Sequence, residues 1–329
     1  MTMHKKMTCI EISEPGGPKV LRAAKRAVPT TAAGEVLVKV AAAGVNGPDM
    51  MQRKGLYPPP KGASDLLGLE IAGEVVALGD DASGWQVGDQ ICALANGGGY
   101  AEYCAVDANH CLPVPTGMSL SDAASLPETY FTIWSNIFMT AELVDGKIYL
   151  VHGGAGGLGT TSIQLGKAFG AIVVATDSPA SRTAICSELG ADRVIDYVKE
   201  DFVNVVRDEF GGADLILDIV GGANIARNIK VANHDARIVQ LAFAAGSKVD
   251  VNLMPVMLKR LTYTGSTLRS RPTSQKTAIR DELKDNVWPL FDSGQLKPVV
   301  GNILPLTKAS EAHAQMESAA HTGKIVLAV

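Results

Sequence analysis

Three glycines spaced as G-x-G-x-x-G stand in the segment LVHGGAGGLGTT, directly after an expected strand and at the opening of an expected helix. They are Gly154, Gly156 and Gly159. Glycine lets the backbone turn tightly and approach a charged group, and the amides at the start of a helix bind negative charge. The context predicts a site for the pyrophosphate of a dinucleotide and favours it over an ordinary tight turn.

An acid and a base follow at the end of the next apolar run, in AIVVATDSPASR. Asp177 follows Gly159 at close to the spacing of about 20 residues that dinucleotide-binding folds show. Its carboxylate suits the two hydroxyls of an adenosine ribose and repels a 2′-phosphate, whereas the guanidinium of Arg182 favours that phosphate. These two residues are therefore candidates for the choice between NADH and NADPH.

The composition excludes several classes of protein. The chain has 329 residues, 47% of them hydrophobic and 19% charged, which is typical of a well-buried globular enzyme of two domains. A formal net charge of −4 does not indicate a nucleic-acid-binding protein, and no apolar run reaches the roughly 18 residues of a membrane span. Five cysteines without a C-x-x-C pair indicate reduced, buried thiols in a cytoplasmic protein. The opening MTMHKKMTCIEI lacks the apolar core of a signal peptide and is expected to be a short disordered leader.

From residue 147 onward, short apolar strands alternate with helical segments. The six expected strands lie in KIYLVHG, AIVVATD, DRVIDY, ADLILDIVG, ARIVQLAF and LTYTGSTL. They are too uniformly apolar to be exposed on either face, so they predict a doubly wound parallel sheet covered by helices on both sides. We assign this Rossmann dinucleotide-binding domain to residues 125–268.

The rest of the chain begins with segments whose residue pattern is typical of β-strands. EVLVKVAAAGV, LEIAGEVVALG and QICALA are expected strands, and LYPPPKG is expected to be a loop because its prolines lack amide donors. Ser119 and Ser121 are possible N-caps of a following helix. Two helical segments and the strand GKIVLAV come after residue 268 and are expected to return to this domain. The fold class is therefore α/β, with a first domain made of residues 1–124 and 269–329.

The order of several motifs resembles one family over nearly the whole chain. AAGVNGPDMMQRKGLYPPP and LLGLEIAGEVVALG precede VGDQICAL and GGYAEYCAV; LPETYFTIW, HGGAGGLG, LGADRVIDY, LILDIVGG and GKIVL follow. The chain is similar to the medium-chain dehydrogenase/reductase superfamily, and within it to the zinc-free quinone oxidoreductases that include zeta-crystallin. The resemblance implies a β-rich GroES-like catalytic domain and a Rossmann domain with a six-stranded parallel sheet.

The resemblance also implies that no catalytic metal is used. Zinc-dependent relatives carry a Cys where this chain has Asn46 and a His where it has Leu69, and their third ligand falls near Glu128. Asn, Leu and one carboxylate do not replace a Cys/His/Cys set, because Zn²⁺ prefers thiolate and imidazole ligands. Without a metal, the expected reaction is hydride transfer from reduced nicotinamide to an activated acceptor, a quinone or an alkene conjugated to a carbonyl.

The resemblance places several residues at the reacting end of the cofactor. Asn46 is expected to be a neutral hydrogen-bond donor beside the nicotinamide. Tyr57 is expected to donate a proton or a hydrogen bond to the acceptor, with a packed loop aromatic as the alternative. Asp49 joins these two as a catalytic candidate, although Asp49 and Glu70 are more typical of residues that hold the loop. Thr129 is expected to bond the nicotinamide amide.

Some other polar residues are weaker candidates. His152, Cys104 and Cys111 are interpreted as structural. Arg269 and Arg271 leave the last strand either near the nicotinamide or as solvated surface residues.

Further residues are assigned to the cofactor from the same resemblance. Lys324 is expected to reach cofactor phosphate, Arg182 aligns with a phosphate-binding Lys of relatives, and Tyr197 aligns with a Tyr near that phosphate. NADPH is the default in this family, but Asp177 predicts that NADH is used at least as well. The expected cofactor contacts are Asn46, Thr129, Gly154, Gly156, Gly157, Leu158, Gly159, Asp177, Ser178, Arg182, Tyr197, Val220, Gly221, Leu241, Leu268 and Lys324.

The function predicted first is a zinc-independent NAD(P)H:quinone oxidoreductase. One alternative is an enone or acyl-alkene reductase with the same hydride geometry, and another is a nucleotide-binding protein with little turnover. The apolar edge strand LTYTGSTL, residues 261–268, is expected to pair two subunits, as it does in relatives. We therefore expect a homodimer with a small-molecule substrate, no nucleic-acid partner and no membrane insertion.

Overall fold

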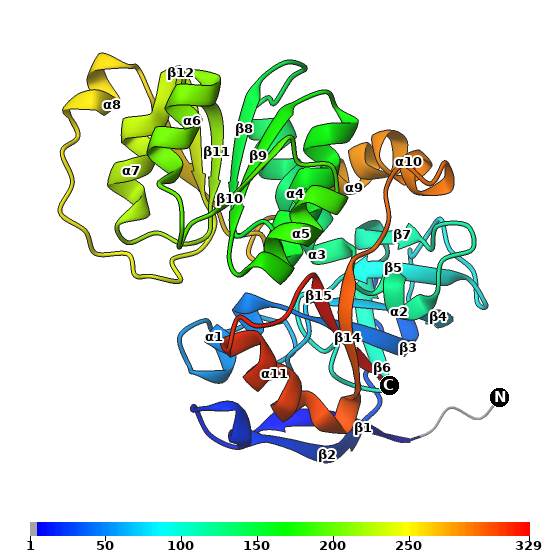
Figure 1. Cartoon of the computed structure of the whole chain (residues 1–329). Coiled ribbons are helices and arrows are strands. Elements are labelled where there is room, and N and C mark those ends of the chain that lie inside the picture. The colour runs from blue at the N-terminus through cyan, green and yellow to red at the C-terminus, as the bar shows by residue number, and fades with distance from the viewer. Residues whose placement is uncertain (1–4) are drawn as a thin grey trace. The chain divides into compact units, whose positions relative to one another are not determined.

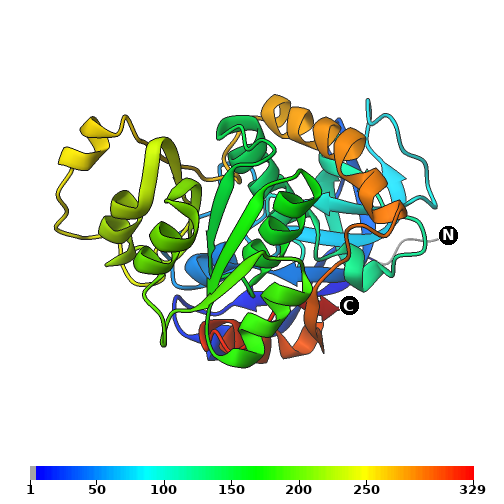
Figure 2. The same cartoon turned by 45° about the horizontal axis from the view of Figure 1, so that its top comes forward.

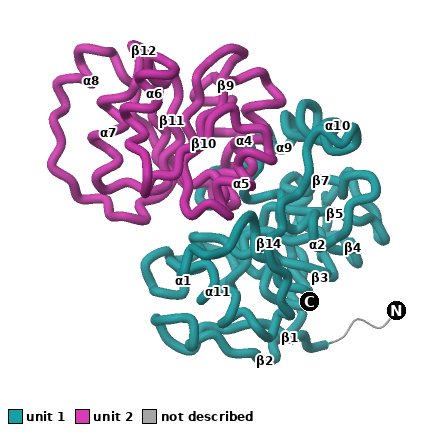
Figure 3. Tube along the Cα trace, viewed as in Figure 1, with its two compact units in different colours: residues 1–131, 269–329 teal, residues 132–268 magenta. Residues whose placement is uncertain are grey.

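The protein, seen here in a computed structural model that describes residues 5–329, divides into two compact units (Figure 3). Unit 1 comprises Met1–Phe131 and Arg269–Val329, and unit 2 comprises Thr132–Leu268. Residues 125–131, which the sequence analysis assigned to the dinucleotide-binding domain, group with unit 1. The assignment of the two domains otherwise stays a prediction.

Unit 2 contains a six-stranded sheet in which every strand pair is parallel. The strands lie side by side in the order β10-β9-β8-β11-β12-β13. The first strand of the unit, β8, is central; β9 and β10 are added on one side of it, and β11, β12 and β13 on the other. This is the doubly wound arrangement of dinucleotide-binding folds, and it confirms the predicted fold class. The strands are β8 (Ile148–His152), β9 (Ile172–Asp177), β10 (Arg193–Asp196), β11 (Ala213–Asp218), β12 (Ala232–Gln240) and β13 (Thr262–Gly265).

Helices cover the sheet of unit 2. α4 and α5 contact the strands β8, β9 and β10, whereas α6 and α7 contact β11 and β12. In both views the yellow helix α8 lies at one end of unit 2, and it contacts α7 (Figures 1 and 2). The helices are α4 (Gly157–Ala168), α5 (Ala180–Glu188), α6 (Phe202–Phe210), α7 (Asn224–Val231) and α8 (Met254–Leu258), preceded by the π-helical turn η3 (Trp134–Thr140).

The core of unit 2 explains the apolar sequence of its strands. Leu150, Val174, Ile216 and Ile238 come from four neighbouring strands and are all fully buried in one cluster. A strand packed against helices has no face for polar residues, so its sequence becomes an unbroken apolar run. The prediction is wrong for the edge strand β13, because Thr262, Tyr263 and Gly265 are exposed.

Unit 1 contains a seven-stranded sheet and a two-stranded sheet. The larger sheet runs β14-β15-β3-β4-β5-β7 with β6 paired to β3, and the smaller pairs β1 with β2. The strands are β1 (Lys6–Ile12), β2 (Leu21–Ala27), β3 (Glu35–Val45), β4 (Glu70–Leu78), β5 (Gln90–Leu94), β6 (Tyr103–Asp107), β7 (Cys111–Pro113), β14 (Val300–Pro305) and β15 (Lys324–Ala328). The α-helices that begin in this unit are α1 (Gly47–Arg53), α2 (Leu120–Ala123), α3 (Pro127–Ile133), α9 (Thr273–Asn286), α10 (Trp288–Asp292) and α11 (Ala309–Glu317).

Three strand ends of the larger sheet bring polar residues together. β3 pairs antiparallel with β4 on one side and with β15 on the other. Asn46 follows the end of β3, Glu70 begins β4 and Lys324 begins β15, so all three lie at the same end of the sheet. A side chain at Gly44 would place its Cβ only 2.0 Å from Oε1 of Glu70, so this approach requires glycine.

Two local expectations need correction. Ser119 caps α2, because its hydroxyl accepts from the amide of Asp122, but Ser121 lies inside that helix and is not an N-cap. The segment Lys6–Ile12 pairs as β1 with β2, so this part of the expected disordered leader is wrong, and residues 1–4 lie outside the described residues. Across residues 5–329, no helix has the length and apolar character needed to span a bilayer.

Candidate functional site

The glycine loop of unit 2 joins β8 to α4. The amides of Gly153 and Gly154 donate to the carbonyl oxygen of Thr176 at 3.0 and 3.1 Å, which anchors the loop to β9. A Cβ at Gly154 would lie 2.8 Å from Sγ of Cys186, and a Cβ at Gly159 would lie 2.2 Å from the carbonyl oxygen of Gly153. Both positions therefore exclude a side chain, and the first amides of α4 keep no helical partner. This loop fits the pyrophosphate of a dinucleotide.

Asp177 lies directly beside this loop at the end of β9. Its carboxylate accepts from the amides of Ala155 and Ser178, both at 2.8 Å. Nε and Nη2 of Arg182 donate to its two oxygens at 2.6 and 3.1 Å. The side chain of Asp177 is only 4% exposed, so ribose hydroxyls would compete with protein donors for it. The backbone amide of Tyr197 reaches the carbonyl of Asp177 at 3.4 Å, and its own side chain is exposed.

Asp218, which the sequence analysis did not single out, organises the other predicted cofactor residues of unit 2. Its Oδ1 accepts from the amides of Val220 and Gly221 at 2.6 and 3.0 Å. Its carbonyl accepts from the amide of Leu241 at 2.9 Å. These loops leave the carboxyl ends of β11 and β12, the edge of the sheet at which such folds bind ligands. Leu268, the last residue of the unit, is buried.

His152 has the structural role that the sequence suggested. Its two ring nitrogens lie 2.9 Å from Oγ1 of Thr176 and 2.8 Å from Oδ1 of Asn228. Burial lowers the pKa of this imidazole, so it is neutral and hydrogen-bonded on both sides.

In unit 1, a buried ion pair forms the centre of a group that we call the Glu70 network. It consists of Asn46, Glu70 and Lys324. Nζ of Lys324 lies 2.5 Å from Oε1 of Glu70 and 2.5 Å from Oδ1 of Asn46, and it also donates to the carbonyl of Val45 at 3.2 Å. Nδ2 of Asn46 donates to Oε1 of Glu70 at 2.9 Å and to the carbonyl of Gly44 at 3.5 Å. Every member is thereby bonded to the others.

The network changes the roles predicted for two residues. The ammonium of Lys324 is buried and has three acceptors within unit 1, so we withdraw the expectation that it reaches cofactor phosphate. Both amide hydrogens of Asn46 face protein acceptors, and a bond to a nicotinamide would have to replace one of them. The contact of Asn46 with the cofactor stays a prediction.

Asp49 holds the loop around this network. Its carboxylate accepts from the amides of Asn46 and Gly68, both at 2.9 Å, and from the hydroxyl of Tyr100 at 3.4 Å. Burial raises the pKa of Asp49 to about 6, although the two amide bonds act in the opposite direction. A carboxylate with all these protein donors supports the loop-holding interpretation over a catalytic role.

Tyr57 lies over a buried guanidinium. Arg269 is 6% exposed, and its Cζ lies 5.8 Å from the centre of the Tyr57 ring. The guanidinium also donates to the carbonyl of Asn96 and to Oε1 of Gln52 at 2.7 Å, so the solvated-surface interpretation of Arg269 is wrong. Burial, and then the nearby Glu128, raise the pKa of the Tyr57 phenol, which keeps it a donor at neutral pH.

Two neighbouring residues lie at the start of α3. The amide of Glu128 donates to Oε2 of Glu70 at 2.8 Å, which ties this helix to the network. Burial, and then the adjacent Glu70, raise the pKa of Glu128 to about 8. The hydroxyl of Thr129 donates to the carbonyl of Leu126 at 3.3 Å, and its predicted bond to the nicotinamide amide stays a prediction.

The donor set at the positions of zinc ligands does not fit Zn²⁺. Leu69 has no ligand atom, and the amide oxygen of Asn46 already accepts from a lysine ammonium. Over residues 5–329, His, Cys, Asp and Glu side chains form no group of three or more that is placed to hold a metal ion.

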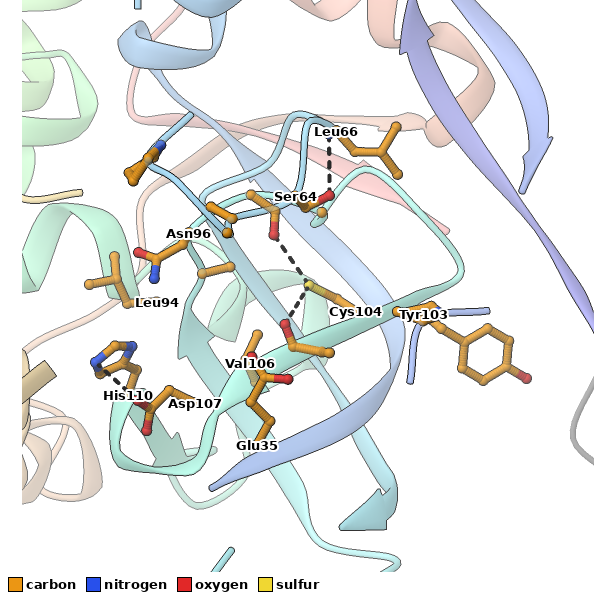
Figure 4. Close-up of a pocket in the computed structure, with 18 of the residues that line it drawn as sticks. Glu35, Ser64, Leu66, Leu94, Asn96, Tyr103, Cys104, Val106, Asp107 and His110 are labelled. Atoms are coloured by element: carbon orange, nitrogen blue, oxygen red, sulfur yellow. Dashed lines mark hydrogen bonds and ion pairs between the residues drawn. The ribbon is translucent and has the colours of Figure 1, made fainter. Parts of the chain in front are cut away.

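Unit 1 also contains a partly open pocket of about 500 Å³ (Figure 4). Cys104, Asp107 and His110 line it, and the thiol of Cys104 donates to the carbonyl of Gly97 at 3.6 Å. Burial raises the pKa of Cys104 to about 12, in keeping with its interpretation as a core residue. None of the predicted site residues lines this pocket. Two of its lining residues lie beside Arg269, because the carbonyl of Asn96 accepts from the guanidinium and a Cβ at Gly97 would lie 3.0 Å from Nη2.

Two family models match the chain. Residues 32–116 match the "Alcohol dehydrogenase GroES-like domain", and residues 189–327 match a model described as "Zinc-binding dehydrogenase". The first lies within unit 1, and the second covers parts of both units.

Known proteins are similar over the full length of the chain. The quinone oxidoreductase of Homo sapiens is 29% identical, covering 99% of both chains. The structure of Escherichia coli quinone oxidoreductase complexed with NADPH has a TM-score of 0.87 and 29% identity, covering 98% of this chain and 100% of that one. The structure of the CurK enoyl reductase has a TM-score of 0.87 and 25% identity, covering 99% of both.

Proposed function

Because this chain belongs to the zinc-free quinone oxidoreductase branch of the medium-chain dehydrogenase/reductase superfamily, we propose that it reduces quinones with NAD(P)H. One observation carries the proposal: Asn46, at the position of a zinc ligand, is bonded instead to a buried Glu70–Lys324 ion pair. Such a site offers hydrogen bonds and charge but no Lewis acid. Those features suit an acceptor that is already activated.

Unit 2 supplies the residues that hold the cofactor. Gly154 and Gly159 let the loop approach a pyrophosphate, and the first amides of α4 bind its charge. Asp177 and Arg182 lie where the adenosine ribose of such folds binds. When bound, reduced nicotinamide supplies the hydride.

Unit 1 supplies the groups that orient the acceptor. The phenol of Tyr57 is a neutral donor, and the guanidinium of Arg269 beneath its ring adds positive charge. Both features stabilise negative charge that develops on a carbonyl oxygen of the acceptor. The buried Glu70 network fixes the surrounding backbone.

The second candidate is an enone or acyl-alkene reductase, because the CurK enoyl reductase has a similar structure. A panel of soluble quinones and linear enones, followed at the absorbance of reduced nicotinamide, separates the two. Higher kcat/KM for quinones supports the proposal, and higher kcat/KM for enones overturns it. Turnover of neither, with tight nucleotide binding, identifies a binding protein instead.

We also propose that NADH is used at least as well as NADPH. Asp177 is buried beside the glycine loop, and its charge opposes a second negative charge at the ribose. Nε and Nη2 of Arg182 are held by Asp177, so a phosphate at the ribose would compete with that carboxylate for the guanidinium.

Metal independence follows from the same donor set. The protein is expected to keep its activity after dialysis against a chelator and to contain zinc far below one ion per chain. Stoichiometric zinc together with loss of activity on chelation would contradict this.

The proposed assembly is a cytoplasmic homodimer formed through β13. This strand is the edge of the six-stranded sheet, and Tyr263 on it is 41% exposed. Met254, Met257 and Leu258 on α8 are also exposed, and apolar surface of this kind is normally covered. Light scattering at micromolar concentration is expected to give twice the mass of one chain. A monomer would contradict the proposal, as would a dimer that survives Tyr263→Lys unchanged.

A further inference from the structure

Glu128 carries a carboxyl group that the structure leaves without a partner. Its backbone amide is fixed by Glu70, but no side chain or amide of unit 1, within the described residues, forms a hydrogen bond or ion pair with its carboxyl group. The side chain is partly buried at the start of α3. It therefore differs from the other two carboxyl groups nearby, Asp49 and Glu70, which are both fully bonded.

The surroundings of Glu128 favour its neutral form. Glu70 lies next to it and is paired with Lys324, and a neighbouring anion opposes a second one. Burial and Glu70 raise the pKa of Glu128 to about 8, Asp49 acts in the same direction, and Lys324 and Lys276 oppose it more weakly than Glu70. At neutral pH this group is therefore a carboxylic acid with a proton to give.

Glu128 also lies within electrostatic range of the residues proposed to orient the acceptor. Its charge acts on the pKa of both Tyr57 and Arg269. Two neighbouring carboxyl groups in different surroundings, one paired with a lysine and one without a partner, are the arrangement that separates acid and base roles in an active site. Here Glu70 is held by protein partners, which leaves the acid role to Glu128.

We propose that Glu128 is the general acid that protonates the reduced acceptor, an inference that rests on the proposed function. The hydride and its electron pair enter the acceptor from reduced nicotinamide and leave an oxyanion. The O–H bond of Glu128 breaks and a new O–H bond forms on that oxygen, giving a hydroquinone or an enol. Water then returns a proton to the carboxylate.

The first test is the pH profile of turnover. For the wild type, kcat is expected to fall as the pH rises through about 8, because the acid form is lost. Glu128→Gln is expected to lower kcat roughly 100-fold or more, to flatten this limb and to leave KM for the cofactor nearly unchanged. Glu128→Asp keeps the acid and is expected to restore part of the rate. Glu74→Gln, an exposed carboxyl on β4, is the matched control and should behave as wild type.

The second test needs no cofactor and no turnover. Infrared difference spectra of the free protein are expected to show a protonated carboxyl band that disappears with a midpoint near pH 8. This band should be missing in Glu128→Gln and present in Glu74→Gln. Absence of the band from the wild type overturns the proposal even if the glutamine variant fails to fold.

The outcomes separate the two levels of inference. A wild type that reduces neither quinones nor enones refutes the proposed function, whatever the infrared result. An active wild type whose rate and pH limb survive Glu128→Gln refutes the role of Glu128 alone. Loss of the limb in Tyr57→Phe rather than in Glu128→Gln would assign the acid to Tyr57.

Discussion

In unit 2 the cofactor site is made mostly of backbone, whereas in unit 1 the site residues meet through their side chains. The loop around Gly154 and Gly159 offers backbone amides and has no side chains at its crowded positions. It joins β8 to α4, which are consecutive in the sequence. The Glu70 network joins the starts of β4 and β15 to the end of β3, and its members are buried charges and one amide.

This difference determines which substitutions should disrupt each site. The glycine loop depends on free space, so a methyl group added at a crowded glycine harms it. A site of paired buried charges depends on each partner, because a lone buried ion is far less stable than the pair. The four predictions below test this contrast.

The largest effect is expected for Lys324→Met. The ion pair with Glu70 is 6% and 0% exposed at its two side chains, so the substitution leaves a buried carboxylate without its partner. We expect the free energy of unfolding to fall by about 3–5 kcal/mol. The control is Lys308→Met, whose pair with Glu311 is about half exposed and should contribute at most about 1 kcal/mol. Urea unfolding measures both variants. Equal decreases in the free energy of unfolding would show that the buried ion pair contributes no more than the exposed one.

The next effect is expected for Gly159→Ala. The new Cβ would lie 2.2 Å from a backbone oxygen, which cannot move without shifting β8 or α4. Overpacking of this kind costs about 1–3 kcal/mol, and we expect nucleotide binding to be lost as well. In Gly156→Ala the nearest atom would lie 3.5 Å away, so its melting temperature should stay near that of the wild type. Calorimetry and nucleotide titration measure both; a fully stable Gly159→Ala protein would contradict the fit of the loop.

A smaller effect is expected for Asp177→Ser. Removing this carboxylate frees Arg182 for a 2′-phosphate, so the ratio of kcat/KM for NADPH over NADH should rise about 5- to 150-fold, equivalent to about 1–3 kcal/mol. Asp208→Ser removes an exposed carboxylate of the same unit and should leave the ratio unchanged. A wild type that strongly prefers NADPH would show that the Asp177–Arg182 pair opens readily for phosphate.

The smallest effect is expected for Tyr57→Phe. The ring keeps its place over Arg269, and only the hydroxyl that bonds the acceptor is lost. We expect kcat for quinones to fall about 10-fold, the equivalent of one hydrogen bond to a charged oxygen. Tyr103→Phe, on β6, serves as the control. Unchanged turnover in Tyr57→Phe would support the packed-aromatic interpretation.

The sequence predicted unit 2 far better than the site of unit 1. The six strands and their parallel arrangement follow from local apolar runs that alternate with helical segments, which are visible within short stretches, whereas the order of the strands comes from the structure. From the sequence, Asp177 and Arg182 were expected to have opposite effects on the choice between NADH and NADPH. That they form an ion pair with each other depends on side-chain geometry, which the sequence does not show. For Lys324 the resemblance gave a phosphate role, because position in a motif does not reveal a buried partner.

The sequence by itself determined the class of fold and the glycine loop, because both depend on residue type and short spacing, whereas the residues at the positions of zinc ligands were identified through the resemblance to the family. Only the tertiary structure decided that Asn46, Glu70 and Lys324 meet, since antiparallel pairing of β3 with β4 and β15 joins positions far apart in the chain. It also decided which carboxyl group is paired and which is not. Ionisation depends on burial and on neighbours in space, and those are set by packing rather than by order along the chain.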